Sequence, residues 1–185
     1  MRQPTRLLLL ACVLALGAAA LEAPRDSAAG EHRVEAVAMP ADYLLGDIAH
    51  YRRETWHWQR VMGAHRTPAA VVRRNRSPHY RRWVRNLWRK RAIAHKRKAH
   101  RPPHRGQWLC IHRHEGRWND PHGPYYGGLQ MDISFQRLYG GELLRRKGTA
   151  ENWTPLEQMW VAERAYRAGR GFYPWPNTAR YCGLI

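Results

Sequence analysis

The chain has 185 residues, enough for one compact domain with extensions and no more. It carries 32 Lys and Arg against 14 Asp and Glu, a net charge of +18, so it should seek anionic partners. Nucleic acid, an anionic membrane and an anionic wall polymer all fit, and the charge alone does not select among them.

The N-terminus has the layout of a secretory signal peptide, which we predict to span residues 1–23. Arg2 and Arg6 precede an apolar run that ends in small residues suited to cleavage. The run is short for a transmembrane span, and Glu22 follows it closely. An uncleaved anchor is the main alternative. The predicted location is therefore secreted or in the cell envelope.

Export makes the three cysteines informative. The string Leu-Leu-Ala-Cys that ends at Cys12 looks like a lipid-attachment box, which leaves a lipoprotein as a further alternative, although few apolar residues precede it. If Cys12 leaves with the signal, Cys110 and Cys182 remain, and two cysteines in an oxidising compartment usually pair. Export also argues against a genomic DNA partner, so no nucleic acid is expected.

An irregular linker, 24–41, leads to a basic helical region that we place at 42–105. Asp42 is a plausible N-cap, and apolar residues then recur at alternating spacings of four and three from Leu44 to Met62. This spacing predicts one stripe of an amphipathic helix, which Gly63 would end.

A second helix is predicted from Ser77-Pro78, an N-cap followed by proline at the first helical position, to about Ala99. Basic residues cover its other faces. Its apolar positions, at helical spacing, are Tyr80, Trp83, Val84, Leu87 and Trp88.

The positive charge is concentrated in these helices. Residues 51–105 hold 18 Lys and Arg and a single acid, Glu54, so the rest of the chain is nearly neutral. One interpretation is a tether that binds an anionic wall polymer or membrane surface through charge and interfacial Trp. The other is a helical stalk whose apolar stripe packs on itself or on the following domain.

After Pro102-Pro103 the charge becomes mixed, and a separate domain is predicted at 106–185. Trp108, Ile111 and Glu115 lie three and four apart and share one helical face, and Gly116 would end that helix. A carboxyl there, beside Trp118, would be partly desolvated, which raises the pKa of a carboxyl. A protonated carboxyl is what a glycosidic oxygen needs from a general acid.

The end of this domain shows a second helix signal. Thr154-Pro155-x-Glu157 is a capping box with proline at the first helical position, and Gly169 can close the helix. Of the two adjacent tyrosines before the glycines, Tyr125 is expected in the core. The tryptophans expected in the core are Trp108, Trp160 and Trp175.

The segment around Glu115, followed by Tyr-Tyr-Gly-Gly-Leu-Gln at 125–130, resembles the resuscitation-promoting-factor type of transglycosylase-like domain, an actinobacterial family related to lysozymes. The resemblance covers about 80 residues. It implies a mainly α fold with a small lysozyme-like catalytic domain behind the basic helices, and it places Glu115 at the catalytic position. The residues that it assigns to the glycan groove are Trp118, Tyr126, Gly127, Gly128 and Gln130.

Two departures from the family pattern matter. His114 stands where the family has Cys, while Cys110 lies one helical turn earlier, so a bridge to Cys182 would hold the same two segments with a small shift. Arg117 replaces a small residue, which would narrow the groove or change its charge. Cys110, His112 and His114 resemble a metal cluster, but residues two apart on a helix point in different directions, so no metal or other cofactor is expected.

The family resemblance suggests cleavage of the β-1,4 bond between N-acetylmuramic acid and N-acetylglucosamine in peptidoglycan. Asp132, and less so Asp120, are the nearby candidates for a second acid. We prefer the reaction with one carboxylate, a lytic transglycosylation, over hydrolysis. The alternative is a non-catalytic wall- or membrane-binding protein that acts through its basic, Trp-rich helices.

Overall fold

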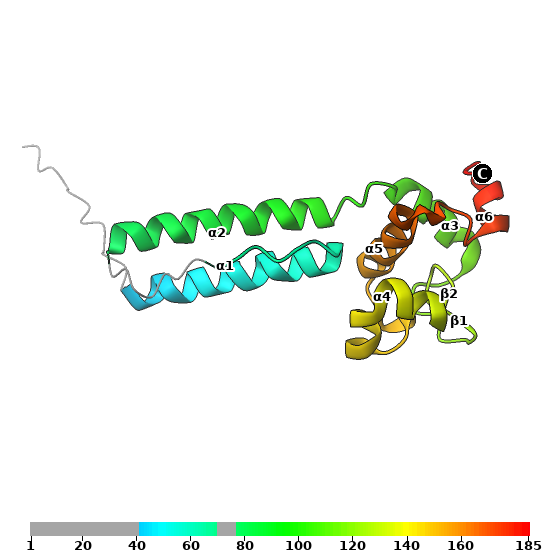
Figure 1. Ribbon diagram of the computed structural model, residues 1–185, viewed down its shortest axis with the longest axis horizontal. Coiled ribbons are helices and arrows are strands. Elements are labelled where there is room, and N and C mark those ends of the chain that lie inside the picture. The colour runs from blue at the N-terminus through cyan, green and yellow to red at the C-terminus, as the bar shows by residue number, and fades with distance from the viewer. Residues whose placement is uncertain (1–40, 70–76) are drawn as a thin grey trace, which may run out of the picture. The chain divides into compact units, whose positions relative to one another are not determined.

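The computed structural model describes residues 41–69 and 77–185, and these are mainly helical (Figure 1). The predicted fold class, mainly α, is therefore confirmed. The predicted signal peptide with Cys12, and all of the linker 24–41 except its last residue, lie outside the described residues. In the described part of the chain, no helix combines the length and the apolar character needed to cross a membrane.

Both predicted basic helices form. Helix α1 spans Ala41–Met62, so it begins one residue before the expected N-cap and ends before Gly63, whose φ is +65°. Helix α2 spans Pro78–Ala99, and the Ser77 hydroxyl accepts a hydrogen bond from the Tyr80 amide at 3.4 Å. The predicted serine cap followed by proline is confirmed.

Helices α1 and α2 run in the same direction. Ile48 in the first half of α1 packs with Val84 and Trp88, while the ends of the two helices meet at Met62 and Ala99. The part of the connection that the structure describes, residues 63–69, lies back along α1 (Figure 1).

The connecting segment is attached to α1 by side chains. Trp56 Nε1 donates to the Thr67 carbonyl at 2.8 Å, and the Arg66 guanidinium lies 3.5 Å from the centre of the Trp56 ring. Gln59 accepts from the Thr67 amide at 3.0 Å. These contacts join residues 8 to 11 apart, beyond the reach of helical periodicity.

The apolar stripe of α2 is only partly buried. Val84 and Trp88 are each 1% exposed, whereas Trp83 is 57% exposed. The grouping of Trp83 with the packed face was wrong. Positions 84 and 88 are four apart and share a face, while Trp83 projects beside it, among the basic residues.

The C-terminal domain is a set of short helices with a two-stranded antiparallel sheet. In the sheet, Tyr125 lies opposite Asp132 and Tyr126 opposite Met131. The elements are α3 (Arg105–Glu115), β1 (Tyr125–Tyr126), β2 (Met131–Asp132), α4 (Ile133–Lys147), η2 (Ala150–Asn152), α5 (Pro155–Ala165), η3 (Tyr166–Arg170) and α6 (Pro176–Tyr181).

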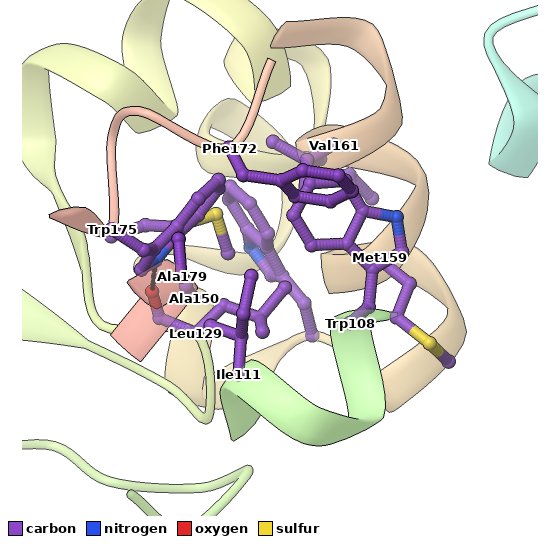
Figure 2. Packing of buried hydrophobic residues seen from close by; sticks show 13 residues of the cluster. Trp108, Ile111, Leu129, Ala150, Met159, Val161, Phe172, Trp175 and Ala179 are labelled. Carbon is purple, nitrogen blue, oxygen red and sulfur yellow. Dashed lines mark hydrogen bonds between the residues drawn. The ribbon is translucent and has the colours of Figure 1, made fainter. Parts of the chain in front are cut away.

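The core of this domain surrounds Trp108 and Ile111 of α3, both fully buried (Figure 2). Two of its tryptophans hold neighbouring segments by their indole N–H. Trp108 donates to Glu163 at 2.9 Å, and Trp175 donates to the Leu129 carbonyl at 2.6 Å. The expected burial of Trp108, Trp160 and Trp175 is confirmed.

Helix α5 begins as expected and ends early. The Thr154 hydroxyl and the Glu157 carboxylate form the reciprocal capping box. The α-helix stops at Ala165 and continues as a π-helical turn to Arg170, in which Gly169 has φ +87°. The regular α-helix is therefore shorter than expected, and Gly169, the predicted end, closes the wider π-helical turn that follows it.

The expected disulfide between Cys110 and Cys182 is present, with the two Cα atoms 6.1 Å apart. It joins α3 to the residue that follows α6, across 72 positions of sequence. The bridge therefore holds together the two segments that position Glu115.

Side chains of α5 also reach the basic helices. Trp160 packs with Val61 and Met62, and its indole N–H donates to the Ala99 carbonyl at 2.8 Å. The next turn contributes Glu163, a fully buried carboxylate that accepts from the His104 amide and from Trp108. These hydrogen bonds join the start of α3 to α5.

Candidate functional site

Glu115 is the last residue of α3, and Gly116 follows as its C-cap. The carboxylate is half-buried, and its Oε1 accepts a hydrogen bond from the Thr178 hydroxyl at 2.6 Å. Thr178 lies in α6, 63 residues along the chain, and is itself buried. Position 115 therefore combines a defined orientation with partial access to solvent.

The loop of residues 127–130 approaches Glu115 through its neighbour Gly116. A Cβ placed on Gly116 would lie 3.1 Å from Gln130 Nε2 and 3.3 Å from Asp120 Oδ2. The Gln130 amide donates to Asp120 Oδ2 and to the Gly127 carbonyl, both at 3.0 Å. Gln130, predicted to belong to one site with Glu115, thus lies against the glycine that follows Glu115 in the chain.

Asp120 is an ionised carboxylate with most of its acceptor capacity in use. Its Oδ1 accepts from the His122 ring at 2.6 Å and from the His122 amide at 3.2 Å, while Oδ2 accepts from Gln130. The hydrogen bonds from the His122 side chain and backbone lower the pKa of the Asp120 carboxyl below its ordinary value. The group therefore serves as an anchor for two loops.

Asp132, the preferred candidate for a second acid, has a structural role at the start of α4. It is the N-cap of α4, and its Oδ1 accepts from the Phe135 amide at 2.7 Å. This capping bond accounts for the residue by itself, because an aspartate there stabilises the start of a helix. Among the described residues, Asp120 rather than Asp132 contacts the Glu115–Gly116 end of α3.

The two tyrosines of β1 are buried in the opposite order to the one expected. Tyr125 is 49% exposed, whereas Tyr126 is half-buried and packs on the core. The assignment of Tyr125 to the core was therefore wrong. A two-residue strand gives no alternating pattern from which the buried face could be chosen.

The glycines of the loop are required by close packing. A Cβ on Gly128 would lie 2.6 Å from the His112 ring and 2.8 Å from the Trp118 ring. Gly127 has φ +71°, and a Cβ there would lie 2.6 Å from the Gln158 side-chain oxygen. The backbone of residues 127 and 128 thus approaches side chains as closely as only glycine allows.

Gln158 is a fully buried glutamine that sequence reasoning missed. Its oxygen accepts from the Gly128 amide at 2.8 Å. Its amide donates to the Trp118 and Ala150 carbonyls at 2.8 Å and to the Trp153 carbonyl at 3.1 Å. The one local signal was a polar residue on an otherwise buried helix; its partners lie up to 40 residues away.

Replacing Gln158 with Leu is expected to lower the free energy of unfolding by about 3 kcal/mol, because four backbone groups lose their hydrogen bond with its side chain. Gln136→Leu is the matched control. This second glutamine is also fully buried, but its amide makes a single hydrogen bond, to the Met131 carbonyl at 2.7 Å. Urea unfolding measures both variants. An equal loss of stability in the two variants would contradict the role of Gln158 as the side chain that joins four backbone groups.

Trp118 and His112 form a stacked pair, with ring centres 3.9 Å apart and planes at 22°. His112 Nδ1 lies 3.1 Å from the Gly128 carbonyl, and since a carbonyl only accepts, Nδ1 carries the proton. An open pocket of about 530 Å³ lies beside this pair at the end of α3. Its lining residues are His112, Arg113, Gly116, Arg117, Trp118 and Asn119.

A metal centre finds little support in the described part of the chain. The one group of metal-ligating residue types brought together there is Cys110, His114 and Cys182, whose ligand atoms lie within 4.8 Å of one another. Both sulfurs are joined in the disulfide, and a metal requires thiolates. His112, also in the motif, instead stacks on Trp118.

The site therefore contains one half-buried carboxylate, held by a threonine, beside a glycine-rich loop and an aromatic pocket. Comparison with protein families, with curated proteins and with solved structures finds no match. Its chemistry is consequently inferred from the residues themselves.

Proposed function

We propose that the chain is a secreted enzyme that cleaves peptidoglycan at the β-1,4 bond between N-acetylmuramic acid and N-acetylglucosamine. One observation carries the proposal: Glu115 ends α3 half-buried and oriented by Thr178, with Gln130 at the adjacent Gly116. A carboxyl in such a place can deliver a proton to a glycosidic oxygen. The half-buried rings of Tyr126 and Trp118 supply flat surfaces suited to sugar rings, while the buried Gly127 and Gly128 let the loop pack closely behind them.

The preferred reaction is a lytic transglycosylation with a single acid. Glu115 protonates the leaving oxygen as the C1–O bond breaks, which leaves an oxocarbenium-like centre at C1 of the muramic residue. The 6-hydroxyl of that residue then attacks C1, and the Glu115 carboxylate takes the hydroxyl proton. The products are a 1,6-anhydro end and a free 4-hydroxyl, and Glu115 is protonated again.

The neighbouring carboxylates favour this route. Asp132 caps α4, and Asp120 accepts hydrogen bonds at both oxygens. A hydrolase of the inverting type needs a second carboxylate free to activate water. Asp120 has both oxygens engaged, and Asp132 has Oδ1 engaged in the cap of α4, so neither carboxylate is wholly free for that role.

The product of the reaction tests the proposal. The purified full chain is incubated with insoluble peptidoglycan, and the soluble products are identified by mass spectrometry. We expect muropeptides that end in 1,6-anhydro-muramic acid. Reducing ends would overturn the transglycosylase assignment in favour of hydrolysis, and the absence of any soluble muropeptide would overturn the enzymatic function.

Thr178 is a positioning residue in this scheme. Thr178→Val keeps the shape of the side chain but removes the donor to Glu115, and we expect the rate of muropeptide release to fall roughly tenfold with little change in the thermal unfolding midpoint. Thr178→Ser, which keeps the hydroxyl, should restore most of the rate. A serine variant as slow as the valine variant would show that packing, not the hydrogen bond, matters.

The basic helices are proposed to bring this domain to an anionic surface, either a wall polymer or a membrane. Much of the exposed surface of α2 is basic. Within the described residues, Arg82, Arg89 and Lys90 make no ion pair. Unpaired surface cations attract polyanions in a salt-dependent way. Replacing these three by Gln should weaken co-sedimentation with cell walls or anionic vesicles at low salt.

The second candidate function is a non-catalytic binder that uses only these helices. The exposed Trp83 on α2, at 57%, favours it, since an exposed indole among basic residues suits an interface.

The matched control for the charge variant is Gln at Arg137, Arg145 and Arg170 of the C-terminal domain. If both triple variants lose binding equally, the helices are not the tether. Binding to cell walls or vesicles without any release of muropeptides would support the second function and contradict the enzymatic one.

A further inference from the structure

The pocket beside the end of α3 has a positively charged rim. Arg113 and Arg117 line it, both side chains are exposed, and neither forms an ion pair with any of the described residues. The Arg113 Nε makes one long hydrogen bond, 3.4 Å, to the Leu109 carbonyl. Both guanidinium groups therefore keep donors available for a ligand.

The floor of the same pocket is held in place before any ligand binds. Trp118 stacks on the His112 ring at 3.9 Å, and Gly128 packs closely against both rings. The Trp118 carbonyl is bonded to the buried Gln158. With Nδ1 of His112 directed to Gly128, its Nε2 has no hydrogen-bond partner among the described residues and can face a ligand.

The negative groups of the site lie outside this pocket. Glu115 precedes Gly116, and Asp120 meets Gly116 from the side of Gln130, but neither lines the pocket. An anionic substituent would be repelled near these carboxylates and attracted near the two arginines. The charges thus define which end of a bound glycan can carry an anion.

We propose that this pocket, resting on the function proposed above, is a subsite for a sugar residue that carries a carboxylate. The carboxylate pairs with Arg113 and Arg117, and the ring lies beside Trp118 and Asn119. Guanidinium groups bind carboxylates through charge-assisted hydrogen bonds. In peptidoglycan the carboxylate belongs either to the peptide stem or, where the stem has been removed, to the lactyl group of muramic acid.

Binding of soluble glycan fragments to the full chain carrying Glu115→Gln tests the subsite without turnover. Calorimetry compares fragments with free carboxylates and the same fragments whose carboxylates have been converted to methylamides. We expect the free form to bind about fivefold more tightly at low salt, a ratio that should shrink as salt screens these exposed charges. Arg113→Gln with Arg117→Gln should abolish the preference.

A matched control distinguishes this pocket from the general positive charge. Arg137→Gln with Arg170→Gln removes the same charge from exposed positions that do not line the pocket, and should keep the fivefold ratio. Equal loss of the ratio in both double variants would overturn the proposal, as would equal binding of the two fragment forms or no binding of either.

Two fragment preparations identify the source of the carboxylate. Stem-bearing fragments present peptide carboxylates only, because their lactyl group is in an amide bond, whereas amidase-treated fragments present the lactyl carboxylate. Whichever preparation binds more tightly in its free-carboxylate form identifies the carboxylate that the pocket binds. If the unmodified chain released no muropeptides, a preference for the free carboxylate would keep the subsite while the proposed function failed. Cleavage by the unmodified chain without this preference would do the reverse.

Discussion

Glu115→Gln is expected to lower the rate of muropeptide release by about 10²–10⁴-fold, the usual contribution of a general acid. The amide has no proton to give to the leaving oxygen. Its carbonyl oxygen can still accept the hydrogen bond from Thr178, so the fold and the glycan affinity should be kept. The rate is measured from soluble products, and the thermal unfolding midpoint is measured in parallel.

Two aspartates provide the controls for Glu115. Asp132→Asn retains an N-cap residue at α4 and should change the rate by less than about twofold. Asp120→Asn weakens the bond to His122 and should reduce the rate moderately through the loops that Asp120 anchors. If Glu115→Gln released as many muropeptides as the unmodified chain, the assignment of the acid would be wrong. A thousandfold loss in Asp120→Asn would instead point to a second catalytic carboxylate.

Removal of the disulfide is the second change with a large expected effect. Cys110→Ser with Cys182→Ser should lower the free energy of unfolding by about 4 kcal/mol, because the bridge closes a loop of 72 residues and restricts the unfolded chain. The activity should fall as well, since the bridge joins α3, which carries Glu115, to the segment that carries Thr178. Urea unfolding and the rate of muropeptide release measure the two effects.

His114→Ala is the control for the disulfide. His114 lies on the same side of α3 as Cys110 and its ring centre is 5.2 Å from that of Tyr181, yet its removal leaves the bridge intact. We expect a loss below about 1 kcal/mol, as for most exposed positions. A double serine variant no less stable than the histidine variant would mean that packing of α3 against α6 suffices without the bridge.

Several parts of the fold could be predicted because they depend on neighbouring residues. The Ser77-Pro78 start of α2 and the capping box of α5 involve side chains three positions from the groups they bind. Gly116 ends α3 beside Glu115 as expected. The pairing of Cys110 with Cys182 followed from having two cysteines left in an oxidising compartment.

Other parts could not be predicted from local pattern. The parallel course of α1 and α2 depends on packing between residues far apart in the chain, such as Ile48 with Trp88, and on contacts such as Trp56 with Thr67 that hold residues 63–69 along α1. Trp83 is exposed although it follows the spacing of the stripe approximately, because only the narrow line through Val84 and Trp88 meets the partner helix. The face of β1 was reversed because two residues carry no periodicity.

The sequence by itself determined the cap of α2, the capping box of α5, the disulfide and the position of Glu115 at the end of a helix. These features rest on interactions between residues close in the chain or on the chemistry of single side chains. The tertiary structure alone decided that Thr178 holds Glu115 and that Gln158 holds the loop of Gly128. Both depend on segments 63 and 30 positions apart meeting in space, which no local pattern encodes.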